Sequence, residues 1–317
     1  MEQKILITGV NGFVGHHVAN ALKEAGNTII GVSNQPTLEE DLQDVVDRYV
    51  CCDLTNQDEI AEKIDLTDVQ AIINLAGFAK VGESRGQGEL YNRVNIGVHT
   101  ALYQECLDQQ VSPRIVAVST GAVYHPNQPL PITEESRLID HDKTNEYTIS
   151  KQLMEEALGE FREQGLQIIV ARPFNHSGPG QLPGFLLPDL GEQIQVAAQE
   201  DKPLLVGNLE TRRDYTDVRD VAAAYVLLAT CPPEQLNHTV YNICSGTSVP
   251  GTKILSLLKN AFGEPDLVVE IDEARIRPND VMDIYGSRDR LTQDTGWEPT
   301  LSVEQMVDDY ANWKKSS

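Results

Sequence analysis

The sequence predicts an α/β protein: a doubly wound parallel sheet covered by helices, followed by a smaller C-terminal lobe. Three observations predict this fold. Apolar strand-like segments alternate with segments of helical periodicity over the first 172 residues. A glycine-rich turn separates the first strand from the first helix, and Pro and Gly become frequent at residues 173–184, where the alternation weakens. Strands that alternate with helices favour a parallel sheet.

The predicted elements follow one another in a regular order. A β-rich run at residues 4–8 leads into the glycine-rich turn at 9–15, a helix at 16–25 and a second strand at 28–32. This order is the opening unit of a dinucleotide-binding fold. Further strands are predicted at 49–52, 71–75, 114–119 and 167–172, and further helices at about 58–64, 91–109 and 146–164.

The division into lobes follows from the weaker alternation of strand and helix patterns after residue 172. We expect residues 1–172 to form a Rossmann domain that binds a dinucleotide, with segments 214–245 and about 281–290 returning to it. Residues 173–213 and 246–317 are expected to form the smaller lobe, which binds the substrate.

Composition excludes several classes of protein. The chain has 317 residues, of which 40% are hydrophobic, as a globular protein requires. No apolar run approaches about 18 residues, so neither a membrane span nor a signal peptide is predicted. The five cysteines include no CxxC pair, which indicates no disulfide framework and no metal site, and favours a cytoplasmic protein with reduced thiols. A net charge of -23 disfavours nucleic acid as a partner, and an anionic substrate would need specific arginines.

The glycine-rich turn has the spacing GxxGxxG and lies between a strand and a helix. Glycine lets the backbone approach a pyrophosphate, and the helix N-terminus favours its negative charge. A glycine-rich turn that binds no cofactor is the alternative. The candidate cofactor contacts here are Gly9, Asn11, Gly12, Phe13, Val14 and Gly15.

The end of the second strand bears on which dinucleotide binds. A carboxylate there would favour NAD and an arginine NADP, but this chain has Ser33 and Asn34. Since no carboxylate would repel a 2′-phosphate, NADP(H) is favoured over NAD(H). Asp53 follows the next strand and is expected to contact the adenine, although a helix cap is the alternative. Further candidate contacts are Leu54, Leu75, Ala76, Gly77 and Pro173.

A YxxxK motif supplies candidate catalytic residues. Tyr147 and Lys151 are four residues apart on a predicted helix and therefore share a face. A phenol titrates near ~10, and a neighbouring ammonium lowers that value, so Tyr147 could exchange a proton with a substrate oxygen. Thr120 lies just past a buried strand, where its hydroxyl could hold that oxygen.

Taken in order, these motifs resemble the extended short-chain dehydrogenases/reductases, and the likeness covers essentially the whole chain. The resemblance implies a Rossmann domain, a nicotinamide cofactor and a Thr120–Tyr147–Lys151 catalytic set. The segments RPFNHSGPGQ, RRDYTDVRD and RPND look like the substrate motifs of nucleotide-sugar members. The resemblance assigns substrate binding to Thr120, Tyr147, Asn175, Leu187, Arg213, Arg277 and Asp280.

The same resemblance narrows the reaction. Dehydratases of the family carry an Asp-Glu pair after the catalytic hydroxyl, and 3,5-epimerising reductases carry a cysteine; this chain has Gly121 and Ala122. The sequences of the substrate motifs are most similar to those of GDP-4-keto-6-deoxy-D-mannose reductases, which make GDP-D-rhamnose. The implied reaction is hydride transfer to C4 of the sugar, with Tyr147 giving the proton.

Two alternatives stay open. One is a UDP-hexose 4-epimerase that retains NAD, and the other is a dinucleotide-sensing protein without catalysis. Family members commonly form homodimers through the helices near 91–109 and 146–164, which this sequence permits.

Overall fold

The computed structural model describes residues 2–276 and 281–316. Its larger part is a seven-stranded sheet in which every neighbouring pair is parallel, in the order β10-β6-β5-β4-β1-β2-β3. The order reverses direction at β1, as in a doubly wound sheet. The strands are β1 (Lys4–Thr8), β2 (Thr28–Ser33), β3 (Arg48–Cys51), β4 (Ala71–Asn74), β5 (Arg114–Val118), β6 (Ile168–Pro173) and β10 (Val240–Ile243).

Helices cover both faces of this sheet, which explains why its strands read as continuous apolar runs. In β1, Ile5 and Ile7 belong to one core cluster with α1 (Phe13–Glu24) and α7 (Val218–Thr230). Leu6 belongs to the cluster on the opposite face. That face is covered by α2 (Gln57–Lys63), α4 (Gly88–Asp108) and α5 (Glu146–Glu163). The predicted parallel sheet is confirmed, and its element boundaries lie within about three residues of the predicted ones.

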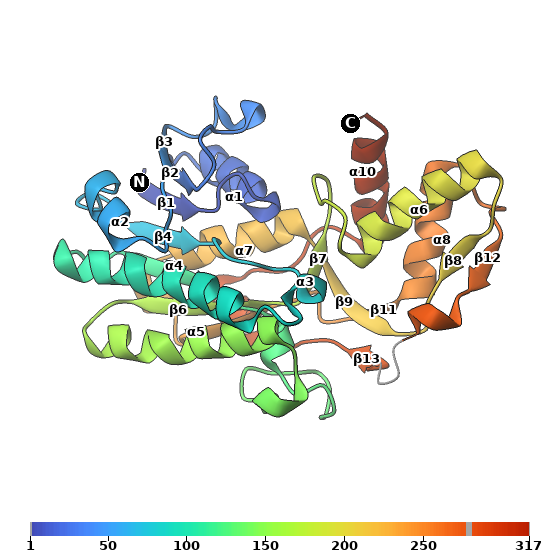
Figure 1. Cartoon of the computed structure of the whole chain (residues 1–317). Helices are drawn as coiled ribbons and strands as arrows, with labels where there is room; N and C mark the ends of the chain where they lie inside the picture. Colours follow the sequence, from blue (N-terminus) through green and yellow to red (C-terminus); the bar gives the residue numbers. More distant parts are fainter. Residues whose placement is uncertain (1, 277–280, 317) are drawn as a thin grey trace.

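The smaller part of the molecule lies beside the sheet (Figure 1). A short sheet of β11 (Ser248–Pro250), β9 (Arg212–Asp217) and β13 (Asp283–Ile284), with β7 (Asn175–Ser177) pairing β9, joins the two parts. Beyond it lie the helices and a parallel strand pair of this part, and a separate apolar cluster joins the helices to the first strand of that pair. These are α6 (Leu186–Glu200), α8 (Gly251–Phe262), α10 (Val303–Ser316), β8 (Leu204–Val206) and β12 (Val269–Ile271).

Short elements complete the described chain: α3 (Val81–Ser84), α9 (Asp289–Thr295), and single-turn helices that include η1 (Glu40–Leu42) and η2 (Gly121–Val123). Within the described ranges, no helix has both the length and the apolar character that crossing a membrane requires.

Candidate active site

A cleft of about 1170 Å³ opens at the carboxyl ends of the sheet strands. Ligands of open α/β sheets bind at this edge. Most of the described residues predicted from the sequence line this cleft. They are Gly9, Asn11, Gly12, Phe13, Val14, Gly15, Leu75, Gly77, Thr120, Tyr147, Lys151, Pro173, Asn175, Leu187 and Arg213.

The glycine-rich turn is compact enough to exclude side chains. Gly9 has a φ of +66°, and the Gly12 amide donates to the Gly9 carbonyl at 2.9 Å. A Cβ on Gly15 would lie 2.3 Å from the same carbonyl oxygen, so only glycine fits there. The turn therefore brings bare backbone and the first turn of α1 to the cleft, which is the arrangement that a dinucleotide pyrophosphate requires.

The residues expected to read the adenosine half lie at the edge of the site. Ser33 ends β2 and Asn34 follows it, while Asp53 and Leu54 come shortly after β3. These four are not among the residues that line the cleft. The Ser33 hydroxyl accepts from the Gln35 amide at 3.2 Å. Asp53 accepts from the Thr55 amide at 2.9 Å, while α2 is capped by another residue, Asn56.

Ala76 supports the turn from beneath instead of lining the cleft. Its amide donates to the Thr8 hydroxyl at 3.0 Å, and its backbone would lie 3.3 Å from a Cβ on Gly9. The close approach of these two segments shows why small residues follow β4.

The candidate catalytic residues Thr120, Tyr147 and Lys151 lie close together in the cleft. Tyr147 and Lys151 lie in the first turns of α5, whose N-cap Asn145 accepts from the Thr148 amide at 3.0 Å. Thr120 follows β5 and caps η2, and its hydroxyl forms a hydrogen bond with Tyr147. The Lys151 ammonium donates to the Val118 carbonyl at 2.8 Å.

Burial acts on both titratable members of the set. It raises the pKa of the Tyr147 phenol above its usual value, and the hydrogen bond from Thr120 opposes this rise. Burial also lowers the pKa of the Lys151 ammonium to about 8, against the opposing charge of Glu155. The uncharged phenol is therefore the favoured form of Tyr147 at neutral pH, as a proton donor requires.

Asn95 of α4 is a site residue that the sequence analysis missed. It is fully buried, and its side chain accepts from the Phe78 amide at 2.7 Å and donates to the Ser150 hydroxyl at 2.9 Å. A Cβ on Gly77 would lie 2.7 Å from Asn95 Oδ1 and 3.9 Å from Lys151 Nζ. Asn95 thus fixes the turn after β4 beside Lys151. No local pattern in the sequence indicates these contacts, because the partners of Asn95 lie 17 and 55 residues away along the chain.

Other missed residues surround the glycine-rich turn. His16, Glu39 and Asp41 line the cleft, and His16 Nδ1 lies 3.2 Å from Asp41 Oδ2. His17 Nε2 lies 2.9 Å from the Pro179 carbonyl oxygen, which ties α1 to the segment after β7. These contacts join distant parts of the chain, so no local motif indicates them.

The side of the cleft that belongs to the smaller part is formed by β7, β9 and α6. Asn175 begins β7, and Arg213 lies on the neighbouring strand β9. Arg213 Nη1 donates to the carbonyls of Arg212 and Val281 at 2.8 and 2.7 Å. Leu187, in the first turn of α6, is buried. Arg277 and Asp280 lie outside the described residues.

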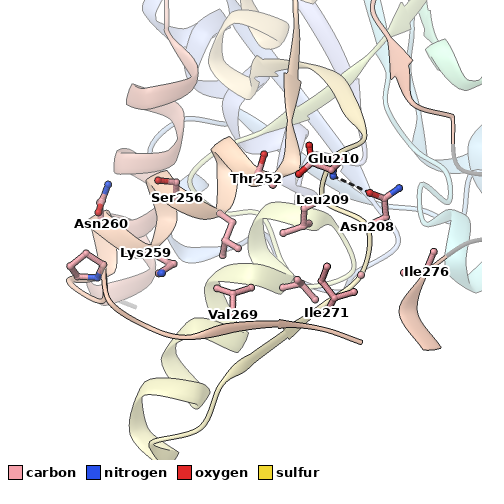
Figure 2. Close-up of a pocket in the computed structure, with 14 residues that line it drawn as sticks. Asn208, Leu209, Glu210, Thr252, Ser256, Lys259, Asn260, Val269, Ile271 and Ile276 are labelled. Atoms are coloured by element: carbon pink, nitrogen blue, oxygen red, sulfur yellow. Dashed lines mark hydrogen bonds between the residues drawn. The ribbon is translucent and has the colours of Figure 1, made fainter. Parts of the chain in front are cut away.

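A second cavity, of about 560 Å³, lies in the smaller part between α8 and β12 (Figure 2). Val269 and Ile271 form one wall, and Ser256 and Lys259 of α8 stand opposite them. None of the described residues predicted as site residues lines it, so the cleft at the sheet edge is the candidate active site.

With this geometry established, comparison with known proteins decides the family. Residues 5–244 match the model of the NAD dependent epimerase/dehydratase family. The chain belongs to this family. Its members are extended short-chain dehydrogenases/reductases, so the resemblance noted in the sequence is confirmed, as is the class of enzyme: an NAD(P)-dependent oxidoreductase.

Three similar proteins refine the comparison. GDP-6-deoxy-D-mannose reductase of Pseudomonas aeruginosa is 31% identical, over 97% of this chain and 95% of its own. UDP-glucose 4-epimerase of Pisum sativum is 25% identical, over 100% and 97% of the two chains. The solved structure of RMD from Pseudomonas aeruginosa complexed with NADPH superposes with a TM-score of 0.80 at 28% identity, and covers 99% of this chain and 100% of that one.

Proposed function

We propose that this protein reduces the 4-keto group of a nucleotide-diphosphate 4-keto-6-deoxyhexose with NAD(P)H, and that the substrate is GDP-4-keto-6-deoxy-D-mannose. The observation that carries the proposal is the Thr120–Tyr147–Lys151 set, of which Tyr147 and Lys151 are buried, in a chain 31% identical to a GDP-6-deoxy-D-mannose reductase. Reduction of a ketone needs one hydride and one proton, and the set provides the proton.

The residue after Thr120 supports reduction over elimination. A Cβ on Gly121 would lie 2.9 Å from the ring of Phe174, which is itself buried. An acidic or thiol side chain at this position would therefore displace the ring. With no acid or base at Gly121, the site retains one proton donor, Tyr147, and that is sufficient for reduction.

The residues around the cleft fit a nicotinamide dinucleotide. Gly9 and Gly15 form a cradle that a Cβ would fill, and Gly77 and Lys151, which lie close together, would hold the nicotinamide ribose. When bound, the cofactor supplies the hydride. Tyr147 donates its proton to the C4 oxygen, Thr120 orients that oxygen, and the Lys151 ammonium stabilises the phenolate that Tyr147 leaves behind.

For the cofactor we propose NADP(H) over NAD(H). β2 ends at Ser33 and is followed by Asn34, so this end of the strand carries a hydroxyl and an amide group that would be compatible with a 2′-phosphate. The similar RMD was solved with NADPH. Glu39 and Asp41, which also line the cleft, would favour NAD, so parallel assays with both cofactors are needed.

The test is the loss of reduced-nicotinamide absorbance when the protein meets GDP-4-keto-6-deoxy-D-mannose, with NADPH and NADH in parallel. We expect rapid oxidation, faster with NADPH. The matched control is the same assay with the protein and cofactor but without the sugar. Absence of oxidation with both cofactors would reject this substrate.

A second candidate, a UDP-hexose 4-epimerase, is favoured by the 25% identity to UDP-glucose 4-epimerase. An epimerase regenerates its cofactor and retains it, so the purified protein would carry bound NAD and would interconvert UDP-glucose and UDP-galactose.

We also propose that the protein forms a homodimer through α4 and α5, which pack side by side on one face of the sheet (Figure 1). Light scattering of the purified protein tests this.

A further inference from the structure

A buried ion pair lies behind the catalytic set. Arg172 of β6 donates to both carboxylate oxygens of Glu155 on α5, with Nε 3.0 Å from Oε1. The two side chains are only 7% and 12% exposed. Arg172 Nη1 also donates to the Tyr124 hydroxyl at 2.9 Å, and that hydroxyl donates to Asn242 at 2.7 Å. A buried pair is a weak source of stability, so its geometry around the site is the more informative feature.

Glu155 contacts the segment that assembles the site. Its Oε1 accepts the hydrogen bond of the Ser119 hydroxyl. Ser119 lies between Val118, whose carbonyl accepts from Lys151, and Thr120, whose hydroxyl contacts Tyr147. The carboxylate therefore anchors the central residue of a three-residue segment that contacts both other members of the catalytic set.

The carboxylate also faces the catalytic lysine. Glu155 follows Lys151 by four residues on α5, so the two side chains share a helix face. The other titratable or charged groups around Lys151 are Tyr147 on the same helix, His99 on α4 and, through Glu155, Arg172 on β6. Among the described residues, Glu155 is the carboxylate whose charge opposes the effect of burial on the Lys151 ammonium.

We propose that Glu155 is a positioning residue: it holds the Val118–Thr120 segment through Ser119 and supplies the negative charge that faces the Lys151 ammonium. This role rests on the proposed function only in that Lys151 assists Tyr147. The contacts themselves form without substrate, so they are testable without it.

The direct test is the titration of Lys151 in protein labelled with ¹³C at the lysine Cε atoms, its resonance assigned by its loss in Lys151→Met. Glu155→Gln should move the titration midpoint to lower pH by roughly one unit or more. The matched control is Glu156→Gln, which removes the same charge from the next, exposed residue, and its midpoint should equal that of the wild type. An unchanged midpoint in Glu155→Gln overturns the proposal.

Two further variants guard against misfolding and against a purely structural role. Removing one partner of a buried pair can unfold a protein, so the double variant Glu155→Gln/Arg172→Gln replaces both charges, and its Lys151 midpoint should also fall. In the reductase assay, Glu155→Gln should move the alkaline limb of kcat/KM to lower pH, and Glu155→Asp should restore it. A limb that stays in place while kcat falls would show a structural role only.

The two proposals fail in distinguishable ways. If the wild type does not reduce the keto sugar while the Lys151 midpoint moves as expected, the proposed reaction is wrong and the role of Glu155 stands. If the keto sugar is reduced and the Lys151 midpoint does not move, the proposed reaction stands and the role of Glu155 is wrong.

Discussion

The two sides of the cleft hold their polar groups in different ways. On the side of the seven-stranded sheet, Tyr147 and Lys151 are buried, and the Lys151 ammonium is fixed to a backbone carbonyl. On the side of the smaller part, Asn175 is exposed, and Arg213 donates hydrogen bonds to the carbonyls of Arg212 on its own strand and of Val281, which precedes β13. Under the proposed function, the chemistry would depend on buried groups of the sheet side, and recognition of the substrate on side chains at the surface of short strands.

This difference indicates which groups relatives are expected to share and which are expected to vary between them. A buried set that depends on sheet and helix geometry suits any member of the family, whether reductase or epimerase. Exposed groups on two- to six-residue strands can change without disturbing the core. The substrate is therefore expected to depend on the smaller part, and substitutions on the two sides should have separable effects.

The largest effect is expected on the sheet side. Tyr147→Phe removes the proton donor and leaves the ring that fills the buried site. Turnover should fall by about 10²- to 10⁴-fold, the range that general acid catalysis contributes, while the dissociation constant of NADPH, measured by fluorescence titration, stays close to wild type. Turnover near the wild-type rate would contradict the assignment.

The next effect concerns the cradle at the glycine-rich turn. In Gly15→Ala the new Cβ would lie 2.3 Å from the Gly9 carbonyl oxygen, so the turn must shift. NADPH binding should be lost or greatly weakened, and the melting temperature should fall. The control is Gly159→Ala in α5, where a Cβ meets nothing within 4 Å and the helix should gain up to about 1 kcal/mol. Equal NADPH affinity in both variants would contradict the proposal that the glycine-rich turn binds the cofactor.

A smaller effect is expected on the other side of the cleft. Arg213→Ala should raise KM for the nucleotide sugar by about 10- to 100-fold, since a hydrogen bond to a charged group contributes about 1.5–3 kcal/mol. Cofactor affinity should not change. Arg212→Ala is the control, because Arg212 bonds Ser248 and does not line the cleft. If the two variants raise KM equally, Arg213 has no special role.

The smallest effect is on stability. The pKa of Lys151 is lowered to about 8 in the folded protein, below the ordinary value near ~10.4. Between these values the unfolded chain binds more protons than the folded one, so this group makes the free energy of unfolding rise with pH in that window. Urea denaturation at pH 8 and pH 10 should show a smaller rise in Lys151→Met than in the wild type. Identical rises in the two proteins would mean that burial does not lower the pKa of Lys151.

The sequence predicted the sheet side of the molecule well because its signals are local. Apolar runs, the GxxGxxG turn and the YxxxK spacing each lie within about ten residues and map directly onto β1, α1 and α5. Asn95 and His17 were missed because their partners lie far along the chain. Glu155 was missed because its hydrogen-bond partners, Ser119 and Arg172, lie on other elements, and its spacing from a nearby lysine on the same helix does not reveal them.

The smaller part was predicted only in outline. β7, β11 and β13 have two or three residues each, too few for a periodic pattern. The pairing of β7 with β9 joins residues 175–177 to 215–217, which no local rule indicates. Asn175 and Arg213 do line the cleft. They were predicted from the resemblance to the family, and the chemistry of the neighbouring residues in the sequence did not predict them.

One consequence follows from the connection between the two sheets. β6 ends at Pro173 and β7 begins at Asn175, so a single residue, Phe174, separates a strand of the large sheet from a strand of the small one. Its ring packs against Gly121 and Gly286, where a Cβ on either would lie within 3 Å of it. A hinge needs room to rotate, and this junction has none. We therefore expect the two sheets to move as one body, with ligands entering through motion of the surrounding loops.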